Sequence, residues 1–318
     1  MNQPGSESAK PRILLTGMTG YIGGLLLGRF EQEGIPVRCL VRRPHRILRP
    51  VSSTTEVVRG DVLQPESLRA AFDGISTAYY FVHSLDATDF ARQDAQAAQN
   101  FAAAAREAGV QRIIYLGGLG GESRCLSPHL QSRHEVGRIF RTSDVETIEF
   151  RAAIVLGSGS FSFQLIRSLT EQLPVLLFPR CADTPTQPIA IDDVLAYLLA
   201  ARELPPGNSR LFEIGGRDVV TYADLLDEYA RQRGLRRVIV RVPVLPPSVA
   251  SLWLGFIAPG AAAVGRQLLE GLCIPTIVRD HSARQVFPQV KPMGFREAMQ
   301  RAISGSDVDA AVKCRVTA

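Results

Sequence analysis

Short apolar runs and longer amphipathic stretches alternate along the first 160 residues. Apolar runs of a few residues that end at glycine, proline or charged residues are typical of buried strands. The predicted strands are 12–16, 37–41, 56–59, 77–82 and 112–116. Between them, helical spacing of apolar residues predicts helices over 21–30, 65–72 and 87–108. Because the connections are far longer than hairpin turns, we expect a doubly wound parallel α/β sheet with helices on both faces.

The alternation loosens in the second half of the chain. Helices are predicted over 132–141, 161–173, 191–202 and 222–233, and strands over 147–155 and 210–214. We therefore expect a core at 11–160 and a further part at 161–304. This second part contains a smaller C-terminal lobe on the substrate side, and its residues 187–215 return to the sheet. The polar end 1–10 is expected to be a disordered tail, and 305–318 an unstructured tail.

A glycine-rich loop separates the first predicted strand from the first predicted helix. In a Rossmann-type fold, Gly17 would permit the tight turn, Gly20 would let the backbone approach a pyrophosphate, and Gly23 would let the helix pack on the strand. The helix N-terminus then presents free N–H groups to the anion. The residues expected to hold the cofactor here are Thr16, Gly17, Thr19, Gly20, Tyr21, Ile22 and Gly23. The alternative is that the glycines only turn the chain.

The end of the second strand bears on the choice of cofactor. An NAD-specific site usually has an acidic residue there, which binds the ribose 2′-hydroxyl. In this chain Arg42 and Arg43 follow Val41, and no acid stands there. Guanidinium groups suit a 2′-phosphate, so we expect NADP(H) in preference to NAD(H). The alternative is that one of the two arginines only faces solvent.

Further cofactor contacts are expected after the third and fourth strands, at the carboxyl edge where open α/β sheets bind ligands. Asp61 would accept a hydrogen bond from the adenine edge, with Val62 beside it; alternatively, Asp61 is a turn acid. Val82 and His83 would lie beside the cofactor, although His83 could equally be a structural histidine.

The composition is that of an ordinary folded protein, with 46% hydrophobic and 21% charged residues. The net charge is +5, but the basic residues are scattered, which argues against a nucleic-acid partner. Five well-separated cysteines without a CxxC pair give no metal site and fit a reducing compartment. Residues 1–10 lack an apolar signal-peptide core, so we expect a cytoplasmic protein without metal.

Residues 242–264 contain no charged residue, and arginines flank them. The length could span a bilayer, but four prolines and two glycines interrupt the segment. Three interpretations stay open: a spanning helix, a peripheral membrane contact, or a buried helix that lines a pocket. In the last case we expect Trp253 near the cavity of a small apolar substrate; the alternative is a core tryptophan.

These motifs together resemble the short-chain dehydrogenase/reductase superfamily, in its extended and atypical branches. The resemblance rests on the glycine loop, on Gly60-Asp61-Val62, and on segments 100–116 and 187–194. Segments 126–137 and 150–160 are similar to the atypical NAD(P)H-binding group, whose members include NmrA-like regulators and an accessory subunit of respiratory complex I. The resemblance implies an NAD(P)H-binding oxidoreductase.

The chain departs from the superfamily where its active members carry Ser and Tyr-x-x-x-Lys. Glycines follow Leu116 in place of the serine, His129 stands in the tyrosine position, and Arg133 stands in the lysine position. Two interpretations follow. His129 could be a substitute acid or base, since its reference pKa of about 6.5 suits proton transfer, with Arg133 on ribose or phosphate. Alternatively, the site binds cofactor without turnover.

The function expected from these residues is hydride transfer to or from a small apolar carbonyl, enone or quinone-like substrate. A non-catalytic NADP(H)-binding regulator or assembly protein is the first alternative, and an NAD(P)-dependent epimerase or isomerase is the second. The sequence leaves the oligomeric state open. Next to the expected site, Glu135, Arg138 and Arg151 are expected to form ion pairs with one another.

Overall fold

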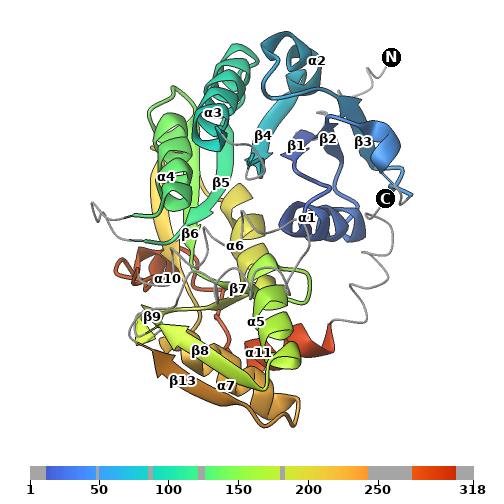
Figure 1. The fold of residues 1–318 in the computed structure, drawn as a ribbon. Coiled ribbons are helices and arrows are strands. Elements are labelled where there is room, and N and C mark those ends of the chain that lie inside the picture. Colours follow the sequence, from blue (N-terminus) through green and yellow to red (C-terminus); the bar gives the residue numbers. More distant parts are fainter. Residues whose placement is uncertain are drawn as a thin grey trace, which may run out of the picture.

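A computed structural model describes residues 12–47, 50–84, 89–120, 126–179, 183–242 and 274–305. Its centre is a seven-stranded sheet with the order β11-β6-β5-β4-β1-β2-β3, in which every neighbouring pair is parallel (Figure 1). The strands are β1 (Arg12–Thr16), β2 (Val37–Val41), β3 (Thr55–Arg59), β4 (Ile75–Tyr80), β5 (Arg112–Gly118), β6 (Glu146–Ala152) and β11 (Arg210–Ile214). The expected fold class is confirmed: a Rossmann-type doubly wound sheet.

Alternating side chains of the strands feed two apolar cores, one on each face of the sheet. In β1, Ile13 and Leu15 join one cluster, and Leu14 joins the other. Side chains of α1, α6 and α10 pack in the first cluster, and those of α2, α3 and α4 in the second. The helices are α1 (Tyr21–Gln32), α2 (Arg69–Phe72), α3 (Phe90–Glu107), α4 (Pro128–Arg141), α6 (Ile191–Arg202) and α10 (Ser282–Val286).

Several boundaries differ from the predicted ones for local reasons. β4 ends at Tyr80, so Val82 and His83 lie in the chain that leaves the strand. α4 begins at Pro128, earlier than predicted, because the Ser127 side chain caps it by accepting a hydrogen bond from the Leu130 N–H. Short 3-10 helices, η1 (Pro44–Arg46) and η2 (Pro65–Ser67), follow β2 and precede α2.

The predicted strand 147–155 is divided in two. After β6 the chain leaves the sheet, and β7 (Val155–Leu156) pairs with β10 (Ile189–Ala190). The expected return of 187–215 to the sheet is made by β11, which pairs with β6. The chain therefore leaves the main sheet and rejoins it at its edge.

A third apolar cluster lies in the smaller C-terminal lobe, apart from the two cores of the sheet. Its elements are α5 (Phe161–Gln172), α7 (Tyr222–Gln232), α11 (Phe295–Ser304) and two short parallel strands, β8 (Val175–Pro179) and β13 (Val238–Val242). A further pair, β9 (Pro185–Thr186) and β12 (Val220–Thr221), is antiparallel. Among the described residues, none of the helices has the length and apolar character needed to cross a bilayer. Residues 243–273, which include Trp253, lie outside the described part.

Two buried arginines hold the amino edge of the sheet to helix ends. Arg112 in β5 bonds Glu146 at 2.8 Å and donates to the carbonyls of Ala201 and Leu204, where α6 ends. Arg38 in β2 bonds the Glu56 carboxylate and donates to the carbonyls of Ala71 and Asp73, where α2 ends. Carbonyls at a helix C-terminus lack intrahelical partners, so each guanidinium satisfies several acceptors at once.

Replacing Arg112 by Met should lower the free energy of unfolding by about 3–5 kcal/mol, because it leaves the buried Glu146 carboxylate and several carbonyls unpaired. Urea unfolding followed by circular dichroism measures this. The matched control is Arg106→Met, since Arg106 is exposed and its ion pair with Asp144 is long, at 3.4 Å. The effect of this variant on the free energy of unfolding should be below about 1 kcal/mol. Equal effects of the two variants would contradict the role given to Arg112.

Candidate cofactor cleft and active site

The Thr16 hydroxyl fastens β1 to β4 where the two strands separate. It donates to the Tyr79 carbonyl oxygen at 3.1 Å and accepts from the Phe81 N–H at 3.0 Å, and Thr16 is 1% exposed. The strand order reverses between β1 and β4, and ligands of such sheets bind at this switch point. The Thr16 hydroxyl is thus hydrogen-bonded to backbone groups of the protein. These bonds fix the position at which the glycine loop leaves the sheet.

Two glycines of the loop are required by the fold itself. Gly17 has φ of 74°, and a Cβ there would lie 2.5 Å from the Phe81 carbonyl oxygen. A Cβ at Gly23 would lie 2.3 Å from the Gly17 carbonyl oxygen, so only glycine lets α1 pack this closely. A Cβ at Gly20 would meet only the Gly17 oxygen, at 3.3 Å. Apart from that one tight contact, no other atom lies within 4 Å of such a Cβ, which leaves room for a pyrophosphate beside the Gly20 backbone.

The start of α1 fits an anionic group. No side chain caps this helix, and its first turn contains no acidic residue. Its first N–H groups are consequently available to a pyrophosphate at the positive end of the helix dipole. Thr19 is exposed beside it, whereas Tyr21 and Ile22 are half-buried. The Tyr21 hydroxyl lies close to Gly157, where a Cβ would be 2.3 Å away.

The expected adenosine side of the cleft lies at the ends of β2 and β3. Arg42 and Arg43 are exposed, and neither forms an ion pair with another described residue. Asp61 accepts the Leu63 N–H at 3.0 Å through Oδ1, which makes it a turn acid. The Val62 carbonyl accepts the Asn100 amide at 2.9 Å, so α3 fastens this loop. The turn role of Asp61 uses one carboxylate oxygen and is compatible with an adenine contact by the other.

Three basic side chains lie near one another, His83 in the chain after β4 and His129 and Arg133 on α4. Burial first, and then the charge of Arg133, lower the pKa of His129 to about 4. Desolvation and the charges of Arg133 and His129 lower the pKa of His83 as well, although its exposed surface leaves it better screened by water. Both imidazoles are therefore neutral near pH 7. The buried Nδ1 of His129 has no hydrogen-bond partner within the described chain.

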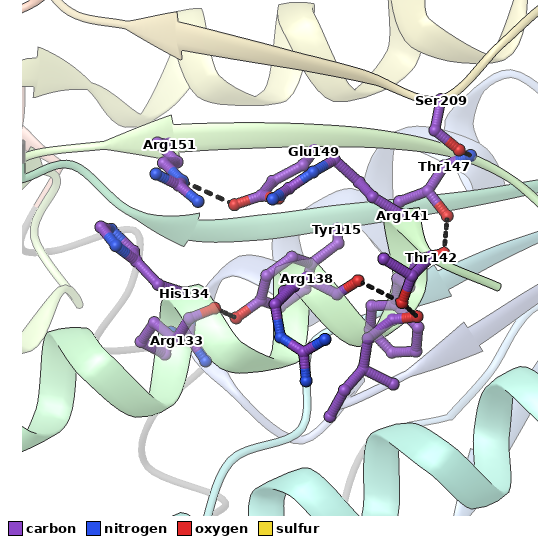
Figure 2. A network of polar contacts seen from close by, with 12 residues as sticks. Tyr115, Arg133, His134, Arg138, Arg141, Thr142, Thr147, Glu149, Arg151 and Ser209 are labelled. Carbon is purple, nitrogen blue, oxygen red and sulfur yellow. Dashed lines mark hydrogen bonds and ion pairs between the residues drawn. The ribbon is translucent and has the colours of Figure 1, made fainter. Parts of the chain in front are cut away.

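Arg133 is held in place from two sides (Figure 2). Its Nη2 donates to the Leu116 carbonyl at 2.9 Å, and its guanidinium lies 5.6 Å from the centre of the Tyr115 ring. Its own carbonyl accepts the Tyr115 hydroxyl at 3.0 Å. These contacts use one face and one nitrogen of the side chain. Arg133 is thus a fixed positive charge at the carboxyl end of β5.

Sequence reasoning missed Asp94, a buried carboxylate of α3. It accepts the Ser84 N–H at 2.7 Å and the Ser132 hydroxyl at 3.2 Å, and it is 2% exposed. Desolvation is the largest influence on its pKa, which is raised. Asp94 connects the segment that carries His83 to the helix that carries Arg133. The only sequence signal is an acid on the alanine-rich face of an amphipathic helix.

The expected ion-pair set is only partly correct. Arg138 bonds Glu135 at 2.6 and 2.8 Å, as expected. Arg151 instead pairs with Glu149 at 2.6 Å, and Arg141 forms a second ion pair with the same carboxylate (Figure 2). Glu149 lies fully buried under Gly137 of α4. The prediction was wrong for Arg151 because apolar periodicity in β6 concealed a buried acid.

A family model described as NAD(P)H-binding matches residues 17–146. The chain is 27% identical over 245 residues to a ceramide reductase of Caulobacter vibrioides, covering 75% of each chain. It is 22% identical over 236 residues to the photosystem II assembly factor Ycf39 of Cyanophora paradoxa, covering 73% of this chain and 72% of the relative. The family match confirms the NAD(P)H-binding domain that the motifs predicted.

Solved structures share the fold at low identity. The triphenylmethane reductase of Citrobacter sp. complexed with NADP(H) has a TM-score of 0.69 at 19% identity, covering 92% of this chain and 99% of that one. The enzyme WbmG of Bordetella bronchiseptica with NAD has a TM-score of 0.69 at 20% identity, covering 96% of each. Since both cofactors occur among these neighbours, the fold leaves the choice between them undecided.

Gly20→Val should abolish NADPH binding in a protein that still folds, because the side chain would fill the space open to the pyrophosphate. NADPH fluorescence titration measures the affinity, and circular dichroism checks the fold. The matched control is Gly28→Val on the same helix, where a Cβ meets nothing within 4 Å; its affinity should stay within about twofold. Undiminished affinity of folded Gly20→Val would refute this loop as the binding site.

The low pKa of His129 predicts a pH dependence of stability. Its native pKa of about 4 lies below the reference value of about 6.5, so between these values the unfolded state binds more protons. Stability from this group should therefore be complete above pH 6.5 and be lost as the pH falls toward 4. NMR titration of the ring protons should give a midpoint near pH 4, and a higher midpoint in Arg133→Gln. A midpoint near 6.5 in the wild-type protein would show that His129 is neither buried nor close to the positive charge of Arg133.

Proposed function

Because the chain carries an NAD(P)H-binding domain in a short-chain dehydrogenase/reductase fold, we propose that it is an NADP(H)-dependent oxidoreductase of the cytoplasm. Its substrate class is an apolar carbonyl, enone or quinone-like compound. The observation that carries the proposal is the cluster of His83, His129 and Arg133 at the carboxyl edge of β4 and β5. The 27% identical ceramide reductase supports the reductase class.

The cofactor, when bound, supplies hydride to the substrate carbon. The protein must then stabilise negative charge that develops on the substrate oxygen. Arg133 offers a fixed positive charge held by Leu116 and Tyr115. Burial, and then the positive charge of Arg133, disfavour protonation of the nearby imidazoles, so His129 and His83 remain uncharged at neutral pH. A neutral imidazole of either residue can donate its N–H to that oxygen.

Proton delivery follows from the same electrostatics. In the free protein the lowered pKa makes His129 a weak base. A negatively charged oxygen beside it would favour the charged imidazolium and raise that pKa, so the ring could then take a proton from water and pass it on. The unpartnered Nδ1 of His129 is the atom we assign to substrate or to the relaying water.

The preference for NADP(H) is assigned to Arg42 and Arg43. Both are exposed after β2 and make no described ion pair, so their guanidinium groups are available to a 2′-phosphate. No acid in that position opposes the phosphate charge or serves the 2′-hydroxyl of NAD.

A second candidate function is an NADP(H)-binding assembly protein or regulator of the NmrA-like kind, without turnover. Two observations favour it. Strand β5 continues through Gly117 and Gly118, where the superfamily has its catalytic serine. The similarity to an assembly factor covers about three-quarters of this chain. NADPH oxidation by the pure protein, with a panel of apolar aldehydes, enones and quinones, separates the two functions: turnover supports the enzyme, and tight NADPH binding without turnover supports the assembly protein.

Replacing Arg42 and Arg43 together by Ala should weaken NADPH binding tenfold or more while changing NADH binding little. Charge-assisted hydrogen bonds to phosphate contribute about 1.5–3 kcal/mol each. Parallel fluorescence titrations measure both affinities. Arg69→Ala, an exposed arginine of α2, is the matched control and should change neither. An equal loss for both cofactors would show that the pair does not bind the 2′-phosphate.

With an active substrate in hand, His129→Gln should lower kcat about 100-fold, since positioned proton transfer contributes about 10²–10⁴-fold. The Kd for NADPH should remain within about twofold, because His129 is assigned to the substrate oxygen. Gln131→Ala, at an exposed position of the same helix, serves as control and should keep wild-type kcat. An unchanged kcat in His129→Gln would remove His129 from the reaction and leave His83 as the imidazole to test.

A further inference from the structure

The C-terminal lobe contains a parallel strand pair that stands apart from the main sheet. β8 and β13 pair in register, with Val238 opposite Val175 and Val240 opposite Leu177. They lie side by side next to α7, at the end of the molecule away from α2 (Figure 1). Parallel strands are normally covered on both faces, because the connections between them place helices there. Where the described residues leave apolar side chains of such a pair exposed, that face is a candidate docking surface.

Among the described residues, one face of this pair is covered more fully than the other, although Leu177 of the outer face also contacts the apolar cluster. Leu176 and Ile239 pack in the apolar cluster that includes α5, α7 and α11. On the outer face, Val238 is 58%, Val175 48% and Val240 39% exposed. These three are half of the six large apolar residues exposed in the described part of the chain, so the apolar surface is concentrated on one face.

Positively charged side chains beside this face favour an anionic partner over a second copy of the chain. Arg233 and Arg236 are exposed in the segment that leads into β13; Arg233 also lies 3.7 Å from the Glu171 carboxylate, and Arg236 forms no ion pair with a described residue. A second copy related by a two-fold axis would bring the same arginines toward one another. An anionic surface would instead neutralise them. The sequence that follows β13 contains no charged residue from 242 to 264.

We propose that the outer face of β8 and β13 docks peripherally on an anionic lipid surface. The valines enter the boundary between headgroups and acyl chains, and Arg233 and Arg236 lie at the lipid phosphates. This inference goes beyond the oxidoreductase function, since it requires neither turnover nor bound cofactor. It would also place the C-terminal lobe at the phase in which apolar carbonyl compounds dissolve.

Flotation with vesicles tests the proposal on the full-length protein. Wild-type protein should float with phosphatidylcholine vesicles that contain about one-third phosphatidylglycerol, and much less with pure phosphatidylcholine. The double variant Val238→Asp/Val240→Asp should bind the anionic vesicles roughly tenfold or more weakly, because charges replace the inserted side chains. Val219→Asp is the matched control: Val219 is 54% exposed, lies before β12, and should bind as wild type.

A second variant keeps the test independent of folding. Arg236→Gln retains the valines and should weaken binding to anionic vesicles only, with a smaller dependence on salt. Circular dichroism and NADPH affinity should be unchanged in all variants. The proposal is overturned if wild-type protein does not float, if the double variant floats as wild type does, or if the double aspartate variant converts a stable dimer to a monomer, which would identify a second copy as the partner.

Discussion

The hydroxyl of Thr16 is the small constraint on which the candidate site depends. β1 and β4 are neighbours whose chains lead to opposite halves of the sheet, so their pairing must end where the cleft opens. At that point the buried Thr16 hydroxyl takes the place of the backbone hydrogen bonds between the two strands: it donates to the Tyr79 carbonyl and accepts from the Phe81 N–H. It fixes Gly17 against the Phe81 carbonyl, and thereby the direction of α1. The free N–H groups at the start of α1 consequently lie at this switch point.

A second constraint is the concentration of positive charge at this edge of the sheet. The uncapped start of α1 and the guanidinium of Arg133 both favour anions. Burial, and then the charge of Arg133, lower the pKa of His129. The charge of Arg133 thus adds to burial in keeping His129 neutral near pH 7. In the superfamily that the motifs resemble, a lysine lowers the pKa of a tyrosine; here burial, and then an arginine, lower the pKa of a histidine.

Much of this arrangement could be predicted from the sequence, and the failures have identifiable causes. Apolar runs located the strands, since burial on both faces leaves a continuous signal, and glycines between strand and helix located the loop. Asp94 and Glu149 could not be found in this way, because their partners come from other elements and apolar periodicity does not encode which acids are paired. Arg151 was assigned to the wrong acid for that reason. The roles expected for Arg42, Arg43 and His129 depend on a bound ligand, which neither strand nor helix patterns contain.

The central claim is that NADPH lies across the β1–β4 switch point with its nicotinamide beside His129 and Arg133. NMR of the protein with bound NADPH tests it most directly, through nuclear Overhauser effects between the nicotinamide ring protons and assigned side chains. The account predicts cross-peaks from the nicotinamide protons to the His129 ring, together with shifted amide signals at Gly20 and Tyr21. Nicotinamide cross-peaks that involve only residues distant from α4, or unperturbed amides at the start of α1, would contradict it.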